Sequence, residues 1–204
     1  MRTGENIRRR ADGRFEARYI KERDGGGRAV YGYCYGKTWE EAARKREEAL
    51  RRTVSVREMN LLVLGAGSHG QEVRELAESL RIFRKIAFLD DAKPEALGSC
   101  RDLGRYLAAY PVAIPAVGDR ALRMRWLGEL AREGFILPVL IHPGAVVSSS
   151  ARVGYGTVVC ARATVGSGAV IGSGCIIGSG ATIDRDVSVP DGTYVGCGQA
   201  VRQM

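Results

Sequence analysis

Aliphatic residues recur at every sixth position through the last third of the chain. The series comprises Val147, Val153, Val159, Val165, Ile171, Ile177, Ile183, Val189, Val195 and Val201. Small residues follow four positions after many of these, and glycines stand between them. Each hexad then makes one flat side of a triangular coil, with its aliphatic side chain inside and glycines at the corners. The pattern predicts a left-handed parallel β-helix of about three coils over residues 142–204.

Strands and amphipathic helices alternate between residues 59 and 141. Strands are expected at 60–64, 85–89 and 112–117. Apolar residues recur at helical spacing from Val73 to Leu80, and again at Leu122, Trp126 and Leu130. This alternation predicts a small, parallel, Rossmann-like sheet, so the chain as a whole is α/β plus all-β in class.

The loop after the first of these strands has the spacing G-x-G-x-x-G. It opens a helix, whose free N–H groups and dipole suit a phosphate. The next strand ends in two carboxylates, where an acid commonly meets a ribose hydroxyl. His69 is either a ligand in this loop or a side chain that caps the turn. The predicted substrate-binding residues are Gly65, Gly67, Ser68, His69, Gly70, Asp90, Asp91, Gly118 and Asp119.

Residues 1–53 predict a module of their own, a three-stranded antiparallel sheet covered by one helix. Its strands are expected at 5–10, 14–22 and 29–36, with turn signals at 11–13 and 24–27. Thr38 and Glu41 have capping-box spacing before the helix. The apolar stripe of that helix consists of Trp39, Ala42, Ala43 and Leu50. Met59 precedes what reads as the start of a separate protein, so we interpret the chain as a gene fusion joined through residues 53–58.

Positive charge is concentrated in this module. Residues 1–59 hold 16 of the 31 Lys and Arg but 10 of the 23 Asp and Glu, which gives +6 of the total of +8. An acidic partner would therefore bind here. The five widely spaced cysteines form no C-x-x-C pair, which predicts reduced thiols and no metal site. Without an apolar stretch that suits a membrane span or a secretion signal, a cytoplasmic protein with no membrane partner is expected.

Basic and apolar residues alternate in the second expected strand, and three tyrosines share one side of the third. Such a sheet can enter a DNA groove, with arginines contacting phosphates or guanine edges. An ordinary solvated basic face explains the charge equally well. The candidate DNA-binding residues are Arg8, Arg10, Arg14, Arg18, Tyr31, Tyr33, Tyr35 and Lys37.

A resemblance favours the first of these alternatives. The segment GENIRRRADGRFEARYIKERDGGGRAVYGYCYGKTWEEA resembles the arm-site-binding N-terminal domain of tyrosine recombinases from conjugative transposons. The resemblance covers residues 1–52 and implies that they bind duplex DNA. It implies no strand cleavage, because no recombinase catalytic domain follows.

Residues 60–204 resemble the bacterial family of sialic-acid O-acetyltransferases and nucleotide-activated amino-sugar N-acetyltransferases. The motifs that carry the resemblance are LLVLGAGSHGQEV, IAFLDD, AVGDRALRMR and LIHPGAVVSSSARVGYGTVV. It implies that the glycine loop and the acidic strand end contact a nucleotide sugar. It also implies that acetyl-CoA, as co-substrate, lies in a groove between neighbouring β-helices of a homotrimer.

The general base of that family is a histidine in a D-H-D segment. Here Asp184-Arg185-Asp186 occupies the corresponding place, and an arginine, which stays protonated, cannot serve as the base. A second alignment likens residues 183–201 to the closing segment of many hexapeptide transferases, with the middle coils missing. His142, in Ile-His-Pro before the coils, is interpreted as structural. The catalytic residue is unknown on either alignment.

Three hypotheses follow for the function. The first is an acetyltransferase of surface glycan synthesis, acting on an amino or hydroxyl group of a nucleotide-activated sugar. The second is a non-catalytic regulator or scaffold that binds DNA through residues 1–52 and retains the sugar-nucleotide domain. The third, a nicotinamide-dependent enzyme, is disfavoured because residues 59–141 are too few for the usual two-half dinucleotide fold.

Overall fold

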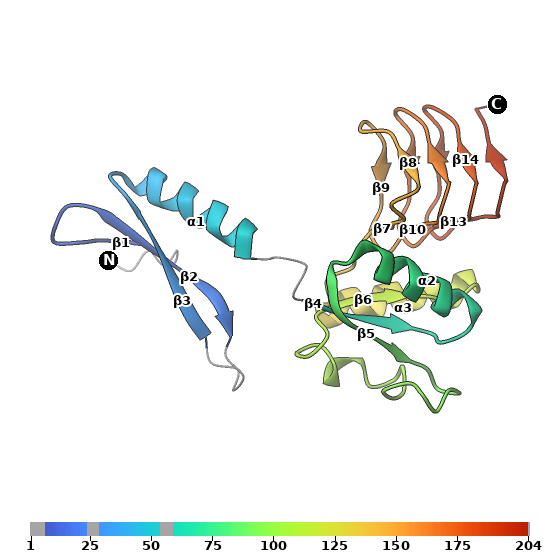
Figure 1. Cartoon of the computed structure of the whole chain (residues 1–204), viewed down its shortest axis with the longest axis horizontal. Helices are drawn as coiled ribbons and strands as arrows, with labels where there is room; N and C mark the ends of the chain where they lie inside the picture. The colour runs from blue at the N-terminus through green and yellow to red at the C-terminus, as the bar shows by residue number, and fades with distance from the viewer. Residues whose placement is uncertain (1–6, 24–28, 54–58, 204) are drawn as a thin grey trace. The chain divides into compact units, whose positions relative to one another are not determined.

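The computed structural model describes residues 7–23, 29–53 and 59–203. The chain forms two compact units, Met1–Val56 and Arg57–Met204, and each is described by itself (Figure 1). The turn expected at residues 24–27 and most of the expected connection at 53–58 lie outside the described residues.

The first unit contains an antiparallel sheet of strand order β1-β2-β3 and one helix. The elements are β1 (Ile7–Arg9), β2 (Phe15–Arg23), β3 (Ala29–Gly36) and α1 (Trp39–Thr53). Gly13 adopts a φ of +80° in the turn before β2, a conformation that glycine adopts without steric cost. Ala17 of β2 and Ala42 of α1 are both fully buried, which shows where helix and sheet pack.

Helix α1 begins where the capping-box spacing predicts. The Thr38 hydroxyl accepts a hydrogen bond from the Glu41 N–H at 3.2 Å, and the Glu41 carboxylate accepts one from the Lys37 N–H at 2.8 Å. These bonds satisfy main-chain donors that the helix leaves free. Trp39, expected in the apolar stripe, is 36% exposed, and the Leu50 side chain lies outside the described part of the chain.

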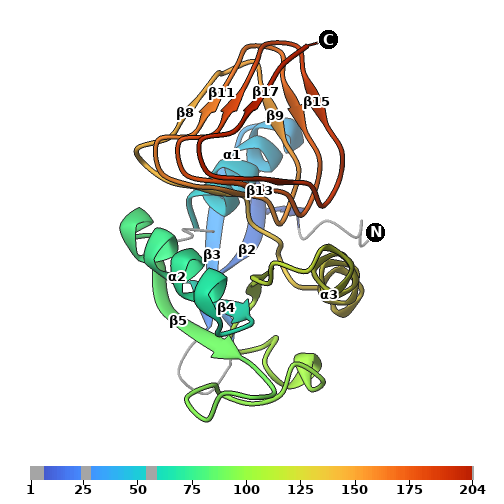
Figure 2. The same cartoon turned by 90° about the vertical axis from the view of Figure 1, so that its right-hand side faces the viewer.

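The second unit opens with a parallel three-stranded sheet of order β5-β4-β6. Its elements are β4 (Met59–Leu64), α2 (Ser68–Leu80), β5 (Phe83–Leu89), the short 3₁₀ helix η2 (Leu103–Arg105), β6 (Val112–Pro115) and α3 (Arg120–Glu133). Alternate residues of β4 face opposite sides of the sheet. Leu61 and Val63 pack with Val73 of α2, whereas Leu62 and Leu64 pack with Leu130 of α3. Figure 2 shows the two helices on either side of β4.

The remainder of the second unit is a parallel β-helix. Residues 18 positions apart pair in parallel, as Val158 does with Ile176 and Ile176 with Tyr194. The three resulting sheets have the orders β7-β10-β13-β16, β8-β11-β14-β17 and β9-β12-β15, and their coils overlap in Figure 2. The strands are Leu140–Ile141, Val146–Val147, Arg152–Val153, Val158–Val159, Thr164–Val165, Val170–Ile171, Ile176–Ile177, Thr182–Ile183, Ser188–Val189, Tyr194–Val195 and Ala200–Val201, numbered β7 to β17 in this order.

The predicted hexads fill the interior of these coils. All ten aliphatic residues of the series belong to one hydrophobic cluster, together with the small residues Ala163, Ala169, Cys175 and Ala181. The β-helix begins slightly before the expected residue 142, because Leu140–Ile141 already pairs with Val158–Val159. Ile141 extends the six-residue period by one step toward the N-terminus.

The Rossmann-like sheet and the β-helix share a hydrophobic core. Leu140, Val158 and Cys160 of the first coils lie in the same cluster as Leu61 and Val73. The two expected domains at 59–141 and 142–204 therefore form a single packed body, in which α2 packs in the same hydrophobic cluster as the outward side chains of β7 and β10.

Candidate functional site

The glycine loop leaves the buried strand β4 and ends at the N-terminus of α2. Gly67 occupies the N-cap position, and no side chain caps the helix there. A Cβ atom added to Gly67 would meet no other heavy atom within 4 Å, so the loop faces open space. The first N–H groups of the helix are thus available to a ligand, and the helix dipole favours an anion such as a phosphate.

Gly65 and Gly70 have a different role from Gly67, because both lie against other parts of the main chain. Gly65 has a φ of +101°, and a Cβ there would approach Val117 Cγ1 at 2.8 Å and the Ala116 carbonyl oxygen at 2.9 Å. A Cβ on Gly70 would overlap the carbonyl oxygen of Gly65. The two glycines therefore let the loop, α2 and the end of β6 pack closely.

Asp90, predicted to meet a ribose, is used within the protein. Its Oδ2 accepts a hydrogen bond from the Ala66 N–H at 2.8 Å, and its Oδ1 accepts one from the Ala92 N–H at 2.8 Å. Asp91 accepts hydrogen bonds from the Ser99 hydroxyl and the Cys100 N–H. The Ser99 hydrogen bond is the main reason that the pKa of Asp91 lies below its usual value. Both carboxylates thus shape the loops around the site.

His69 lies in the first turn of α2 with its side chain 17% exposed. Its Nδ1 lies 3.1 Å from the Glu72 carboxylate, and its Nε2 is buried without a hydrogen-bond partner. This arrangement orients the imidazole toward Glu72, in place of the turn cap considered from the sequence. His142, by contrast, accepts a hydrogen bond from the Gly144 N–H at 2.9 Å, as a structural residue would.

The loop between β6 and α3 supplies the last predicted pair. Asp119 is the N-cap of α3, and its Oδ1 accepts a hydrogen bond from the Leu122 N–H at 2.6 Å. Gly118 is exposed, with no heavy atom within 4 Å of a Cβ added there. Since Gly65 abuts Val117, the loops after β4 and β6 meet at the same edge of the sheet. Ligands of parallel α/β sheets bind at this edge.

A separate hollow of about 450 Å³ lies near Asp91. Its lining includes Asp91 and Arg101, and Trp126 and Glu133 from α3. Asp91 is the one predicted site residue in this lining, which contains no residue of the glycine loop. The structure therefore does not gather all predicted site residues around this hollow.

The Asp184-Arg185-Asp186 segment forms an exposed corner of the β-helix between β14 and β15. Asp184 Oδ1 accepts a hydrogen bond from the Arg185 N–H at 2.8 Å. Asp186 has a φ of +56°, and its N–H donates to the Ser167 carbonyl at 2.9 Å. Hydrogen bonds thus hold the corner, and it presents a guanidinium, which stays protonated, at the place where the family resemblance predicts the base.

Arg123 was not among the residues predicted from the sequence; it is a buried arginine of α3, only 1% exposed. Its guanidinium donates hydrogen bonds to four main-chain carbonyls, those of Val117, Gly118, Gly174 and Gly192. Burial lowers the pKa of Arg123. The sequence signal was its spacing, because Arg123 shares one face of α3 with the buried Leu127 and Leu130, four and seven positions later.

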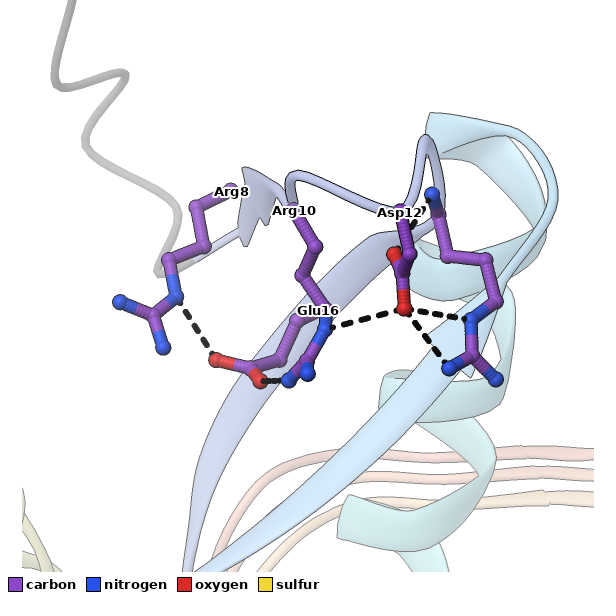
Figure 3. A network of polar contacts seen from close by, with 5 residues as sticks. Arg8, Arg10, Asp12 and Glu16 are labelled. Atoms are coloured by element: carbon purple, nitrogen blue, oxygen red, sulfur yellow. Dashed lines mark hydrogen bonds and ion pairs between the residues drawn. The ribbon is translucent and has the colours of Figure 1, made fainter.

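The first unit carries its predicted basic residues on one face, but carboxylates pair with several of them. Glu16 accepts hydrogen bonds from Arg8 at 2.8 Å and Arg10 at 2.7 Å, as Figure 3 shows. Asp12 forms ion pairs with Arg10 at 3.5 Å and Arg14 at 2.7 Å. Burial alone would raise the pKa of Glu16, but the hydrogen bonds from Arg10 and Arg8 lower it below its usual value.

The three predicted tyrosines lie on the same face and are 40–48% exposed: Tyr31, Tyr33 and Tyr35. The Arg18 guanidinium stacks over the Tyr31 ring, 4.5 Å from its centroid, and Arg10 lies over Tyr35 at 5.5 Å. Such cation–π contacts hold the arginines flat along the sheet. Lys37 is exposed at the end of β3, where its main chain helps to cap α1.

Across residues 7–23, 29–53 and 59–203, no group of three or more His, Cys, Asp or Glu side chains is arranged to hold a metal ion. Within the same ranges, no helix combines the length and apolar character needed to cross a membrane.

Comparison with known proteins places the second unit among sugar acetyltransferases. The family model of the PglD N-terminal domain matches residues 60–130. UDP-N-acetylbacillosamine N-acetyltransferase of Bacillus subtilis is 34% identical over 118 residues, which are 50% of this chain and 51% of that protein. The chain thus spans about half the length of this curated relative.

Solved structures extend the similarity. The acetyltransferase domain of PglB from Neisseria gonorrhoeae is 36% identical, with a TM-score of 0.68 over 71% of this chain and 74% of that domain. The same domain in complex with acetyl coenzyme A is 30% identical, with a TM-score of 0.58 over 71% of this chain and 93% of that one. These relatives lend no support to the recombinase resemblance of residues 1–52. Through its second unit, the chain belongs to the bacterial family of nucleotide-sugar acetyltransferases.

Proposed function

We propose that the second unit binds a nucleotide-activated sugar at the glycine loop and transfers an acetyl group to it from acetyl-CoA, in the synthesis of a surface glycan. The observation that carries this proposal is the uncapped helix N-terminus at Gly67, open to solvent, in a chain 36% identical to an acetyltransferase domain. The pyrophosphate of a nucleotide sugar is the anion that suits this N-terminus.

The amino or hydroxyl group of the sugar is the nucleophile in this reaction. Its nitrogen or oxygen bonds to the acetyl carbon, the carbon–sulfur bond breaks, and the coenzyme leaves as a thiolate that takes up a proton. The proton lost by the nucleophile needs an acceptor, and Arg185 cannot be one. We therefore propose that this chain acetylates amines that arrive unprotonated and pass the proton that they lose on acylation to the departing thiolate, so that its rate rises with pH over the titration of the sugar amine.

The test is to incubate the full chain with acetyl-CoA and a panel of UDP-activated amino and hydroxy sugars, and to follow release of free thiol between pH 6 and 9. Thiol release that depends on one sugar and increases with pH supports the proposal. Acetyl-CoA alone is the blank for hydrolysis. If the protein binds neither acetyl-CoA nor any nucleotide sugar, the proposal is wrong.

An assembly of three copies is part of the same proposal, because the family resemblance implies that acetyl-CoA binds between neighbouring β-helices. Apolar side chains on the outside of two sheets support it, since Val146 is 67% and Val170 40% exposed. Sedimentation velocity should give a species of three times the mass of 22.1 kDa. A monomer at micromolar concentration would contradict it.

A second proposal concerns the first unit, and the arginine–tyrosine face of its sheet favours it. We propose that this face binds duplex DNA, with arginines on phosphates and the tyrosines against the backbone. The face carries Arg8, Arg10, Arg14 and Arg18 against the carboxylates of Asp12 and Glu16, so its net charge is positive. Arg18 is the arginine chosen for the test, because its guanidinium stacks on Tyr31, 4.5 Å from the ring centroid.

Fluorescence anisotropy of the full chain with a labelled duplex tests this second proposal. Binding should weaken steeply as salt is raised, because phosphate contacts release counterions. Arg18→Ala should weaken binding, whereas Arg44→Ala, which removes an ion pair with Glu48 on α1, should not. Lack of binding at low salt would exclude it.

A further inference from the structure

Arg123 joins three segments that lie far apart in the sequence. Its Nη1 donates to the carbonyls of Val117 at 2.8 Å and Gly118 at 2.9 Å, in the loop between β6 and α3. Its Nε donates to the Gly174 carbonyl at 2.8 Å, and its Nη2 to the Gly192 carbonyl at 2.7 Å. The planar guanidinium is suited to such a fixed set of acceptors, whereas an ammonium group is a single point charge on a flexible stem.

The two carbonyls of the β-helix belong to one corner of the prism. Gly174 and Gly192 are 18 residues apart, so they occupy the same position on successive coils, and both have a positive φ, of 63° and 68°. Met124 of α3 lies against both glycines. Arg120, one turn earlier in α3, donates to the Asp191 carbonyl at 2.8 Å, but that contact is exposed. Arg123 is the buried part of this attachment.

The loop that Arg123 holds is the one that borders the glycine loop. Gly65 abuts Val117, and Gly118 faces open space. A shift of Val117 and Gly118 would therefore move one wall of the site where we place the nucleotide sugar. The same guanidinium is anchored to the coils along which we place acetyl-CoA. Because transfer rates depend steeply on the distance and angle of the reacting groups, a fixed spacing between these two regions matters for the reaction.

We infer that Arg123 is a positioning residue that fixes the loop of Val117 and Gly118, and with it the nucleotide-sugar site, against the β-helix. This inference rests on the proposed function for its consequence in binding, but the attachment itself can be measured without any ligand. The residue is not catalytic, because its donors are directed to main-chain carbonyls.

The experiment compares the wild type with Arg123→Lys, which keeps the charge but cannot reproduce the four bonds. Without ligand, hydrogen exchange of the amides of residues 116–122 should become at least tenfold faster in R123K. The dissociation constant for the UDP-sugar identified in the panel should rise at least tenfold, while that for acetyl-CoA changes less than twofold. The matched control is Arg74→Lys on α2, an exposed arginine paired with Glu78, which should change none of these.

A loss of both affinities in parallel with a lower melting temperature would mean a general structural role and would overturn the inference. Unchanged exchange at residues 116–122 would overturn it as well. If the wild type binds no nucleotide sugar, the proposed function fails, and the inference is decided by the exchange data alone.

A measurement on the wild type covers the case in which R123K does not fold. The Nε–H proton of Arg123 should exchange with solvent at least a hundredfold more slowly in NMR spectra than those of exposed arginines. Exchange as fast as that of the exposed arginines would show that the guanidinium is not held, and would overturn the inference.

Discussion

The carboxylate of Asp90 accepts a hydrogen bond from the main-chain N–H of Ala66 at 2.8 Å. The residue after β5 thereby holds the middle of the glycine loop, next to the hydrogen bond that the Gly65 N–H donates to the Leu89 carbonyl at 2.8 Å. The acid at this place in the sequence thus acts on the shape of the loop, and the open helix N-terminus beside it depends on that shape.

Gly67→Ala should weaken binding of the nucleotide sugar without changing the stability of the protein. Its φ of −72° is ordinary for alanine, and the added methyl group would stand in open space, so the melting temperature should not change. The methyl group would, however, project where a phosphate must approach the helix. We expect the dissociation constant for the nucleotide sugar to rise about tenfold, or about 1.4 kcal/mol, by calorimetry.

Gly70→Ala is the counterpart that should affect the fold. Its methyl group would overlap the carbonyl oxygen of Gly65, a main-chain atom that cannot move aside alone. We expect a loss of about 2–4 kcal/mol in the free energy of unfolding, measured with urea. Equal stabilities of G67A and G70A would contradict the different roles assigned to these glycines.

The β-helix of the second unit could be predicted from sequence because each six-residue hydrophobic repeat corresponds to one side of a coil. Val159 and Val165 are six residues apart and both face inward, as the hexad pattern requires. The close packing of the Rossmann-like sheet on the β-helix was not predictable, because it brings Leu61 and Val158, which are far apart in the sequence, into one hydrophobic cluster. A six-residue period describes neighbours within the coils and says nothing of what covers them.

Arg185→His should increase acetyl transfer. An imidazole at this corner, between Asp184 and Asp186, would supply the proton acceptor that an arginine cannot provide. General base catalysis contributes at least about 100-fold, so a gain of that order is expected in single-turnover rates. The pH profile should gain an inflection at about pH 6.5, the usual histidine pKa.

Arg185→Gln is the control, since it removes the charge without adding a base and should stay at the wild-type rate. If R185H is no faster than R185Q, this corner does not lie beside the acceptor amine, and the second alignment of residues 183–201 is favoured.

Gly174→Ala should cost more stability than Gly180→Ala. Both residues have a positive φ, of 63° and 69°, which an alanine adopts at a cost of about 1 kcal/mol. Only at Gly174 would the methyl group also press on α3, 2.8 Å from Met124 Sδ, whereas at Gly180 it would meet nothing within 4 Å. We expect a further loss of about 1 kcal/mol for G174A in urea unfolding. In the Met124→Ala background, which removes the closer contact and leaves Leu127 Cδ2 at 3.1 Å, the difference between the two variants should become smaller.

Thiol labelling should distinguish Cys197 from the buried cysteines. Cys197 is exposed, whereas burial raises the pKa of Cys100 and Cys160 to about 12. At pH 8 only about one in ten thousand of the latter thiols is ionised, and the thiolate is the reactive form. With an aromatic disulfide reagent, the wild type should show a rapid labelling phase from Cys197, and this phase should be absent from Cys197→Ser. Rapid modification of Cys160 in the folded protein would contradict the shared core around it.

The first unit should loosen in acid because of Glu16. Its pKa is lowered in the folded state, so the group stabilises that state above its unfolded pKa, and this contribution is lost as pH falls through the folded value. Below about pH 4 we expect faster hydrogen exchange at residues 15–19 of the full chain. Glu16→Gln should show this faster exchange already at neutral pH, whereas Glu48→Gln, at an exposed ion pair, should not.

The candidate site was only partly predictable from sequence. The spacing from Gly65 to Gly70 indicated the open helix N-terminus, because Gly65 and Gly70 allow close main-chain packing and Gly67 leaves the start of the helix uncovered. Arg123 could not be found in this way, since its four acceptors are main-chain carbonyls, and these are present at every residue whatever the sequence. Likewise, nothing in the sequence near Arg8 and Arg10 showed that Glu16 would lie between them; that follows from the pairing of β1 with β2.

The pairing of residues 18 positions apart also limits how the gene for this protein can change in length. An insertion or deletion of one or two residues that no corner absorbs would shift every later aliphatic side chain from the interior to a corner or to solvent. Gain or loss of a complete coil of 18 residues leaves each later side chain paired with the equivalent position of the neighbouring coil. Variants of the β-helix that survive selection should therefore differ in length by complete turns, with irregular loops confined to the corners.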